Sequence, residues 1–244
     1  MTALLLSGMA LINAAEPMLI GRRGCAGGVE NSAEAYKEAV KRGFKMIEGH
    51  VRTTADSVLV TSHDGKTARL GGNLKIEGSN YADLKAEKYT QTREDSLTYT
   101  GGICTVEDFL TICRDGGATA VLHLKKFPKE AAYPSLDRLA SLINRVSAPE
   151  NVLVLTSEPE YIEYLMAKYP DLPLMYQAEK KWAEMFEWCK EKGLNIDLEK
   201  TLLTPECEKM YHDAGLKIAV WTVNDPAEAA SINADYIITD TMMP

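Results

Sequence analysis

Two short segments of the sequence carry reactive side chains at alternate positions. Glu48 and His50 lie two residues apart, and so do His123 and Lys125. Because side chains of a β-strand alternate between its faces, each pair would share one face of a sheet. Burying two polar groups there is costly unless they have partners or a function. One carboxylate and two imidazoles, from Glu48, His50 and His123, would suit a divalent metal such as Zn²⁺, Mn²⁺ or Fe²⁺.

Other polar side chains end or follow apolar segments elsewhere in the sequence. Three of the chain's four histidines belong to this group, and the fourth, His212, is interpreted as a surface group near the end of a helix. Besides the two pairs above, the group contains Arg22, Arg23, His63, Asp64, Thr222, Asn224 and Asp240.

These residues must be positioned by short apolar segments that alternate with helical stretches along most of the chain. Apolar runs predict strands at 18–23, 45–51, 57–62, 118–125, 151–156, 172–176, 216–222 and 235–239. Apolar residues at three-to-four spacing predict helices at 31–41, 105–113, 133–146, 159–169, 179–191, 205–214 and 226–232. Thr204 before Pro205 and Asp225 before Pro226 are typical helix starts.

About eight strands that alternate with helices predict an α/β fold, a single closed (β/α)₈ TIM barrel rather than an open doubly wound sheet. Active sites of such barrels lie at the carboxyl ends of the strands, where the polar residues fall. The polar segment 66–102, after the third predicted strand, holds one short helical stretch at 81–87. We interpret it as an excursion over the site, within one domain that spans residues 1–244.

Composition limits the partners of this chain. At 244 residues with 45% hydrophobic residues, the chain can bury one sizeable core. A net charge of −8 argues against nucleic acid as a partner, since binding a phosphate backbone requires a clustered positive field. A local cationic pocket for one small phosphate remains compatible with this charge.

The cysteines and the N-terminal segment bear on the cellular compartment. Five cysteines without a CxxC pair predict neither a disulfide framework nor a thiolate zinc site, so a reducing, cytoplasmic location is expected. The apolar segment 2–15 is too short to cross a bilayer, and no transmembrane segment is predicted. We interpret it as a helix that covers one end of the fold. The alternative is a clipped signal peptide on an exported protein.

Seven motifs in sequence order carry a resemblance to a known family. They are "LIGRRG", "VENS", "IEGHVRTTADSVLVTSHD", "ICTVEDFL", "VLHLKK", "VWTVND" and "ADYIITD". Together they extend from about Leu19 to Asp240, and the chain resembles the glycerophosphodiester phosphodiesterase family of TIM-barrel enzymes. The resemblance implies cleavage of glycerophosphodiesters to glycerol 3-phosphate and an alcohol, usually with Ca²⁺ or Mg²⁺.

The resemblance also implies roles for individual residues. His63 corresponds to the second acid/base histidine of the family. The other correspondences are Arg23 with the arginine that holds the phosphate, Glu30 with an acidic residue, Glu48 with a metal carboxylate, Lys125 with a lysine beside the substrate, and Trp221 and Asn224 with the pattern that closes the pocket.

Three core functional positions depart from the family pattern. Arg22 stands at the first acid/base histidine, His50 at a metal aspartate and His123 at a metal glutamate. An arginine stays protonated and cannot exchange protons at accessible pH. Ca²⁺ and Mg²⁺ prefer oxygen ligands, so two imidazoles in place of carboxylates should weaken their binding.

Two hypotheses about function therefore remain open. In the first, the chain is a metal-dependent phosphoric diester hydrolase in which Glu48, His50 and His123 hold Mn²⁺, Zn²⁺ or Fe²⁺ rather than Ca²⁺ or Mg²⁺. His63 and Arg23 would be the catalytic residues. The substrate would be bound by Arg22, Arg23, Lys125 and Trp221. In the second, the chain is catalytically inactive and acts as a binding or regulatory module for a phosphate ligand such as glycerol phosphate, without a metal.

Overall fold

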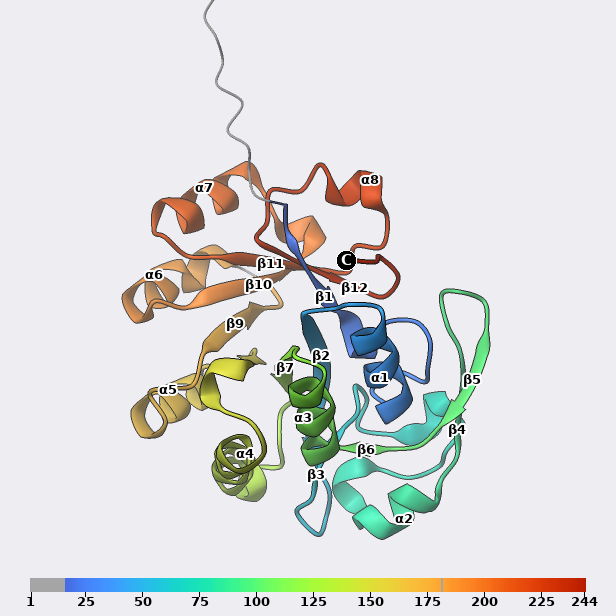
Figure 1. The fold of residues 1–244 in the computed structure, drawn as a ribbon. Coiled ribbons are helices and arrows are strands. Elements are labelled where there is room, and N and C mark those ends of the chain that lie inside the picture. The colour runs from blue at the N-terminus through green and yellow to red at the C-terminus, as the bar shows by residue number, and fades with distance from the viewer. Residues whose placement is uncertain (1–15, 181) are drawn as a thin grey trace, which may run out of the picture.

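The computed structural model of the chain describes residues 16–180 and 182–244, and its central feature is a closed barrel of eight parallel strands (Figure 1). Strand β1 pairs with both β2 and β12, which closes the barrel. The predicted α/β TIM-barrel fold is confirmed. The barrel strands are β1 (Met18–Gly21), β2 (Met46–Thr53), β7 (Thr119–Leu124), β8 (Val152–Thr156), β9 (Leu174–Ala178), β10 (Asn195–Glu199), β11 (Ile218–Trp221) and β12 (Tyr236–Thr239).

Helices lie between successive barrel strands in the sequence and surround the barrel (Figure 1). The predicted starts are confirmed for two of them: Thr204 Oγ1 accepts a hydrogen bond from the Cys207 N–H at 3.2 Å, and an Asp225 carboxylate oxygen accepts one from the Ala227 N–H at 2.9 Å. The helices are α1 (Ala33–Lys41), α3 (Val106–Asp115), α4 (Ala132–Val146), α5 (Pro159–Lys168), α6 (Trp182–Lys192), α7 (Pro205–Asp213) and α8 (Pro226–Ala229).

Two strands differ from the sequence prediction. The segment predicted as a barrel strand at 57–62 forms β3 (Leu59–Thr61), which runs antiparallel to β2 and pairs with β6 (Cys104–Thr105) outside the closed barrel. The remaining barrel strand is β10, which the sequence prediction missed. Its polar residues alternate with Ile196 and Leu198, so the segment has no continuous apolar run.

The excursion after β3 is folded rather than irregular. It contains α2 (Tyr81–Ala86) and a hairpin of β4 (Tyr89–Thr92) and β5 (Thr98–Gly101). In β4, Gln91 Oε1 accepts a hydrogen bond from the Glu30 N–H at 2.9 Å. Just beyond β4, the buried Arg93 donates to the Gly28 carbonyl at 3.3 Å. The excursion is thus attached to the loop that follows β1.

The interior of the barrel changes from apolar to polar along its axis. An apolar cluster fills part of the interior and includes Ile20, Met46, Val121, Leu153, Leu155, Met175, Ala219 and Ile238. Two residues further along β2 and β7, Glu48 and His123 are also buried. Because the side-chain period of a strand is two, the polar residues continue the inward-facing rows of the apolar cluster toward the carboxyl ends of the strands.

Further observations concern the cysteines and the membrane. All five cysteines are buried and unpaired, as the absence of a disulfide pattern predicts. Within the described residues, no helix has the length and apolarity needed to cross a membrane. The helix predicted in segment 2–15 lies outside the described residues, and the cytoplasmic location stays a prediction.

Candidate active site

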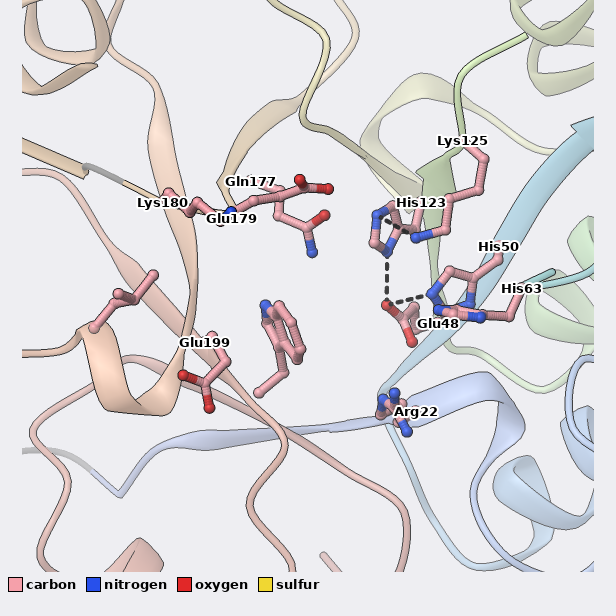
Figure 2. A pocket seen from close by; sticks show the side chains of 12 residues that line it. Arg22, Glu48, His50, His63, His123, Lys125, Gln177, Glu179, Lys180 and Glu199 are labelled. Atoms are coloured by element: carbon pink, nitrogen blue, oxygen red, sulfur yellow. Dashed lines mark hydrogen bonds and ion pairs between the residues drawn. The ribbon is translucent and has the colours of Figure 1, made fainter. Parts of the chain in front are cut away.

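A cavity of about 500 Å³ lies at the carboxyl ends of the barrel strands (Figure 2). It brings together all but one of the residues predicted for catalysis, substrate binding and metal binding. The exception is Arg23, which does not line it. The lining residues are Arg22, Glu48, His50, His63, His123, Lys125, Gln177, Glu179, Lys180, Glu199, Leu202 and Trp221.

Glu48, His50 and His123 form a buried cluster on neighbouring strands β2 and β7. Glu48 Oε1 lies 3.1 Å from His123 Nδ1 and 3.6 Å from His50 Nε2 (Figure 2). The two imidazole rings lie 4.5 Å apart between centroids, which follows from the pairing of His50 with His123 in the sheet register. The His50 backbone N–H donates to Asn31 Oδ1 at 2.9 Å, which fixes this part of β2.

The electrostatics of this cluster favour one ionised carboxylate and two neutral imidazoles. Burial is the main cause that lowers the pKa of His50 and of His123, so both rings are neutral at neutral pH. Burial alone would raise the pKa of Glu48, but the hydrogen bond with His123 and nearby positive charge lower it to about 2. One potential ligand atom from each residue lies within 4.8 Å of the others.

This donor set fits a borderline transition metal better than a hard cation. Neutral imidazole nitrogens together with one carboxylate suit Zn²⁺, Mn²⁺ or Fe²⁺. His50 Nδ1 is buried and has no hydrogen-bond partner among the described residues, so this ring has an unused nitrogen. Ca²⁺ and Mg²⁺ are bound mainly by oxygen ligands, and this cluster offers them only one carboxylate.

His63 is held in one orientation by the residue that follows it. Its Nδ1 lies 2.7 Å from Asp64 Oδ1. Burial alone would raise the pKa of Asp64, but hydrogen bonds from His63 and Arg69 lower it, so the ionised carboxylate accepts a hydrogen bond from the Nδ1–H of His63. Nε2 of the neutral ring is then free to accept a proton. Burial, followed by the charge of Arg23, lowers the pKa of His63 to about 4, so the ring is neutral at pH 7.

Three cationic side chains, Arg22, Lys125 and Lys180, line the same cavity. Arg22 Nη1 lies 3.2 Å from a carboxylate oxygen of Asp240 at the end of β12. Lys125 Nζ lies 3.3 Å from His123 Nε2, and burial is the main cause that lowers the pKa of Lys125 to about 8. Their positive charge would attract a phosphate group.

Arg23 faces away from the cavity, because its Nη1 lies 3.0 and 3.1 Å from the two carboxylate oxygens of Glu30. Its backbone N–H donates to Glu48 Oε2 at 3.4 Å. Arg23 has a φ of 52° and Gly24 a φ of 88°, and a Cβ on Gly24 would lie 2.8 Å from Ala35 Cβ. This tight turn explains why glycine follows Arg23. The arginine contributes its charge from behind the cavity wall.

The contribution of Glu30 to the stability of the fold can be tested by its dependence on pH. Burial alone would raise its pKa, but Arg69, Arg23 and Gln91 lower it from 4.5 to about 2. A carboxylate whose pKa is lower in the folded than in the unfolded protein stabilises the fold at any pH above its unfolded pKa. This stabilisation is lost as the pH falls through the folded-state pKa. We expect Glu30→Gln to lower the free energy of unfolding at pH 7 by roughly 3 kcal/mol, a deficit that shrinks from about pH 5 toward pH 2.

Urea unfolding across this pH range measures the effect of Glu30→Gln. The control is Glu107→Gln, which removes the same charge from an exposed pair with Arg145 and should cost less than about 1 kcal/mol. Equal losses in both variants, or a deficit for Glu30→Gln that does not change with pH, would contradict the expectation.

The sequence prediction missed several residues that line the cavity. Gln177, Glu179, Lys180, Glu199 and Leu202 lie at or beyond the ends of β9 and β10. In Figure 2, Gln177, Glu179, Lys180 and Glu199 lie across the cavity from the histidines. The alternation rule that groups Glu48 with His50 could also have grouped Gln177 with Glu179.

Asn224 does not line the cavity, although the resemblance assigns it to the pattern that closes the pocket. Its Oδ1 accepts hydrogen bonds from the Asp240 N–H at 2.8 Å and from Thr239 Oγ1 at 3.0 Å. It therefore holds the end of β12, from which the Asp240 carboxylate reaches Arg22.

Comparison with known proteins identifies relatives of the chain. The model of the "Glycerophosphoryl diester phosphodiesterase family" matches residues 18–243. The Mycobacterium tuberculosis protein named "Probable glycerophosphodiester phosphodiesterase 2" is 26% identical over 229 residues, which cover 86% of this chain and 81% of that protein.

Solved structures show the same fold. An Oleispira antarctica phosphodiesterase in complex with the product sn-glycerol-3-phosphate has a TM-score of 0.77 at 18% identity, and the match covers 92% of this chain and 93% of that one. A glycerophosphodiester phosphodiesterase from Thermotoga maritima has a TM-score of 0.74 at 20% identity, covering 93% and 95%.

Proposed function

Since the chain belongs to the glycerophosphoryl diester phosphodiesterase family, we propose that it hydrolyses a small glycerophosphodiester to glycerol 3-phosphate and an alcohol. The observation that carries this proposal is the pair of His63 and Asp64, with Nδ1 and Oδ1 2.7 Å apart, in a cavity also lined by cationic Arg22 and Lys125. A group that accepts protons and groups that neutralise phosphate charge both contribute to hydrolysis of a phosphodiester.

In the proposed reaction, water attacks phosphorus and the bond from phosphorus to the alcohol oxygen breaks. His63 Nε2 takes the proton of the attacking water and returns it to the leaving alkoxide, so one group serves as base and then acid. Arg22 and Lys125 balance the negative charge that grows on the phosphoryl oxygens. Trp221 lines the same cavity and would contact the substrate.

A divalent metal would be held by Glu48, His50 and His123. When bound, Zn²⁺, Mn²⁺ or Fe²⁺ would supply Lewis acidity toward a phosphoryl oxygen. Glu48 is placed to act as the charged ligand because the Arg23 N–H and His123 fix both of its oxygens. Its negative charge offsets part of the charge of the ion.

One observation favours a second candidate, a phosphate-binding module without catalysis. Both ring nitrogens of His123 already have partners, Nδ1 with Glu48 and Nε2 with Lys125. The chain of hydrogen bonds from Lys125 through His123 to Glu48 is therefore satisfied without an ion. Together with Arg22 at the position of the first acid/base histidine, this arrangement would bind phosphate and leave the diester intact.

An assay of hydrolysis separates the two candidates. Purified chain is incubated with bis(p-nitrophenyl) phosphate and with glycerophosphodiesters that carry different alcohols, across several divalent ions, and nitrophenol or glycerol 3-phosphate is measured. Turnover that saturates with substrate supports the hydrolase. Binding of glycerol 3-phosphate by calorimetry without turnover under any of these conditions supports the module.

Arg22 should matter mainly for substrate binding. We expect Arg22→Ala to raise KM roughly 10-fold or more with a smaller change in kcat, because a charge-assisted hydrogen bond to phosphate contributes about 1.5–3 kcal/mol. Asp240 keeps a cationic neighbour in this variant, since Arg93 lies 3.5 Å away. Steady-state kinetics measure the effect, and Arg145→Ala, an exposed arginine in an ion pair, is the control. An unchanged KM would exclude Arg22 from substrate binding.

A further inference from the structure

Arg69, in the short 3₁₀ helix Thr67–Leu70 of the excursion, joins two carboxylates from separate segments. Its Nε donates to Asp64 Oδ2 at 2.6 Å. Its Nη1 and Nη2 donate to Glu30 Oε2 and Oε1 at 2.9 and 2.5 Å. Asp64 follows β3 and Glu30 lies in the loop after β1, so one guanidinium connects both segments.

The two carboxylates differ in how firmly the surrounding residues hold them. Glu30 is buried and is also held by Arg23 and Gln91, so it is a fixed anchor. The Asp64 side chain is 35% exposed. One of its carboxylate oxygens pairs with His63 and the other with Arg69. Without Arg69, the Asp64 carboxylate would be free to rotate toward solvent. The orientation of the His63 ring therefore depends on Arg69 through Asp64.

A guanidinium is suited to this position for a geometric reason. Its planar fork of five N–H donors can serve two carboxylates in fixed directions, whereas a lysine ammonium is a single point of charge on a flexible stem. Arg69 itself does not line the cavity that contains Glu48 and His50. It lines a neighbouring cavity together with His63 and Lys125, so a direct contact with the substrate would change KM, whereas an effect through His63 would change kcat.

We propose that Arg69 is a positioning residue that fixes His63 for proton transfer by holding Asp64 against the anchor Glu30. The inference rests on the proposed function, because it assigns the excursion a part in that reaction. The excursion thus supports His63, the proposed acid/base group, and also covers the loop that follows β1.

Kinetics of Arg69→Ala test this proposal. We expect kcat to fall roughly 10- to 100-fold, the usual loss when a residue that orients a functional group is removed, while KM changes less than kcat. Arg145→Ala is the matched control, because it removes a guanidinium that makes two hydrogen bonds to Glu107 at 2.8 and 2.9 Å on the surface. It should leave kcat within about 2-fold, as surface pairs contribute little.

Two further measurements separate positioning from loss of stability. The Arg69 side chain is 43% exposed, so guanidinium ion added at millimolar concentration should reach the vacated position and restore part of kcat in Arg69→Ala. In a His63→Ala background, Arg69→Ala should cause no further loss. The proposal is overturned if kcat stays within 2-fold of wild type, or if Arg69→Ala lowers activity equally with and without His63.

Imidazole NMR distinguishes failure of this inference from failure of the proposed function. The His63 Nδ1–H resonance, assigned by its loss in His63→Ala, should be present in the wild type and shift or vanish in Arg69→Ala but not in Arg145→Ala. If the wild type hydrolyses no diester, the proposed function fails and this spectrum alone decides the inference. An unchanged His63 resonance in Arg69→Ala would then refute it.

Discussion

Replacement of His63 by alanine should lower kcat by roughly 100- to 10,000-fold, the contribution typical of a positioned acid/base group. His63 is the histidine of the cavity that pairs with an aspartate at Nδ1 and keeps Nε2 available, whereas His50 and His123 are fully buried beside Glu48. Binding of glycerol 3-phosphate should change little, since the cationic lining is intact. The hydrolysis assay and calorimetry measure the two effects.

His212→Ala is a suitable control for this loss. His212 pairs with Asp235 at 3.1 Å near the end of α7 and does not line the cavity, so the variant removes the same side chain elsewhere. Thermal melting of both variants shows whether they are folded. Activity of His63→Ala within 3-fold of wild type, in a folded sample, would remove His63 from the mechanism.

The second large effect concerns the metal. We expect purified chain to contain close to one transition metal ion per molecule, and His50→Ala to reduce its affinity for that ion by at least about 100-fold, since loss of supporting contacts alone costs 10- to 100-fold. Activity should be lost in chelator and restored by Mn²⁺, Zn²⁺ or Fe²⁺ but not by Ca²⁺, because two of the three ligand atoms are imidazole nitrogens.

Elemental analysis of the purified protein provides a measurement that does not depend on turnover. His212→Ala again serves as the control, and its metal content should equal that of the wild type. Equal activity in Ca²⁺ and in chelator would refute the metal-dependent version. A chain that contains no metal but binds glycerol 3-phosphate would favour the phosphate-binding module.

The sequence predicted the barrel and most of the cavity because both depend on alternation within strands. Glu48, His50 and His123 could be grouped from their spacing in the sequence, since strands of a parallel barrel place alternate residues on one face at the same end. The same rule failed for β10, in which Asn195 and Asp197 interrupt the apolar pattern and Asp197 is nevertheless buried.

Other features could not be predicted because they depend on contacts between distant segments. The sequence motif places Arg23 beside Arg22, but only the fold turns Arg23 toward Glu30 and leaves Arg22 in the cavity. The support of Asp64 by Arg69 likewise needs the path of the excursion. The assignment of residues 1–244 to one domain, the helix in segment 2–15 and the absence of nucleic acid partners stay predictions.

The closure of the barrel between β1 and β12 has a consequence for biosynthesis. The pair of Arg22 and Asp240 spans 218 positions of the chain, and contacts of such long range form slowly because a large loop must close first. During translation, Arg22 emerges from the ribosome long before its partner. A nascent chain that lacks β12 therefore has an open seam beside Arg22, and the barrel closes only after this last barrel strand has been synthesised.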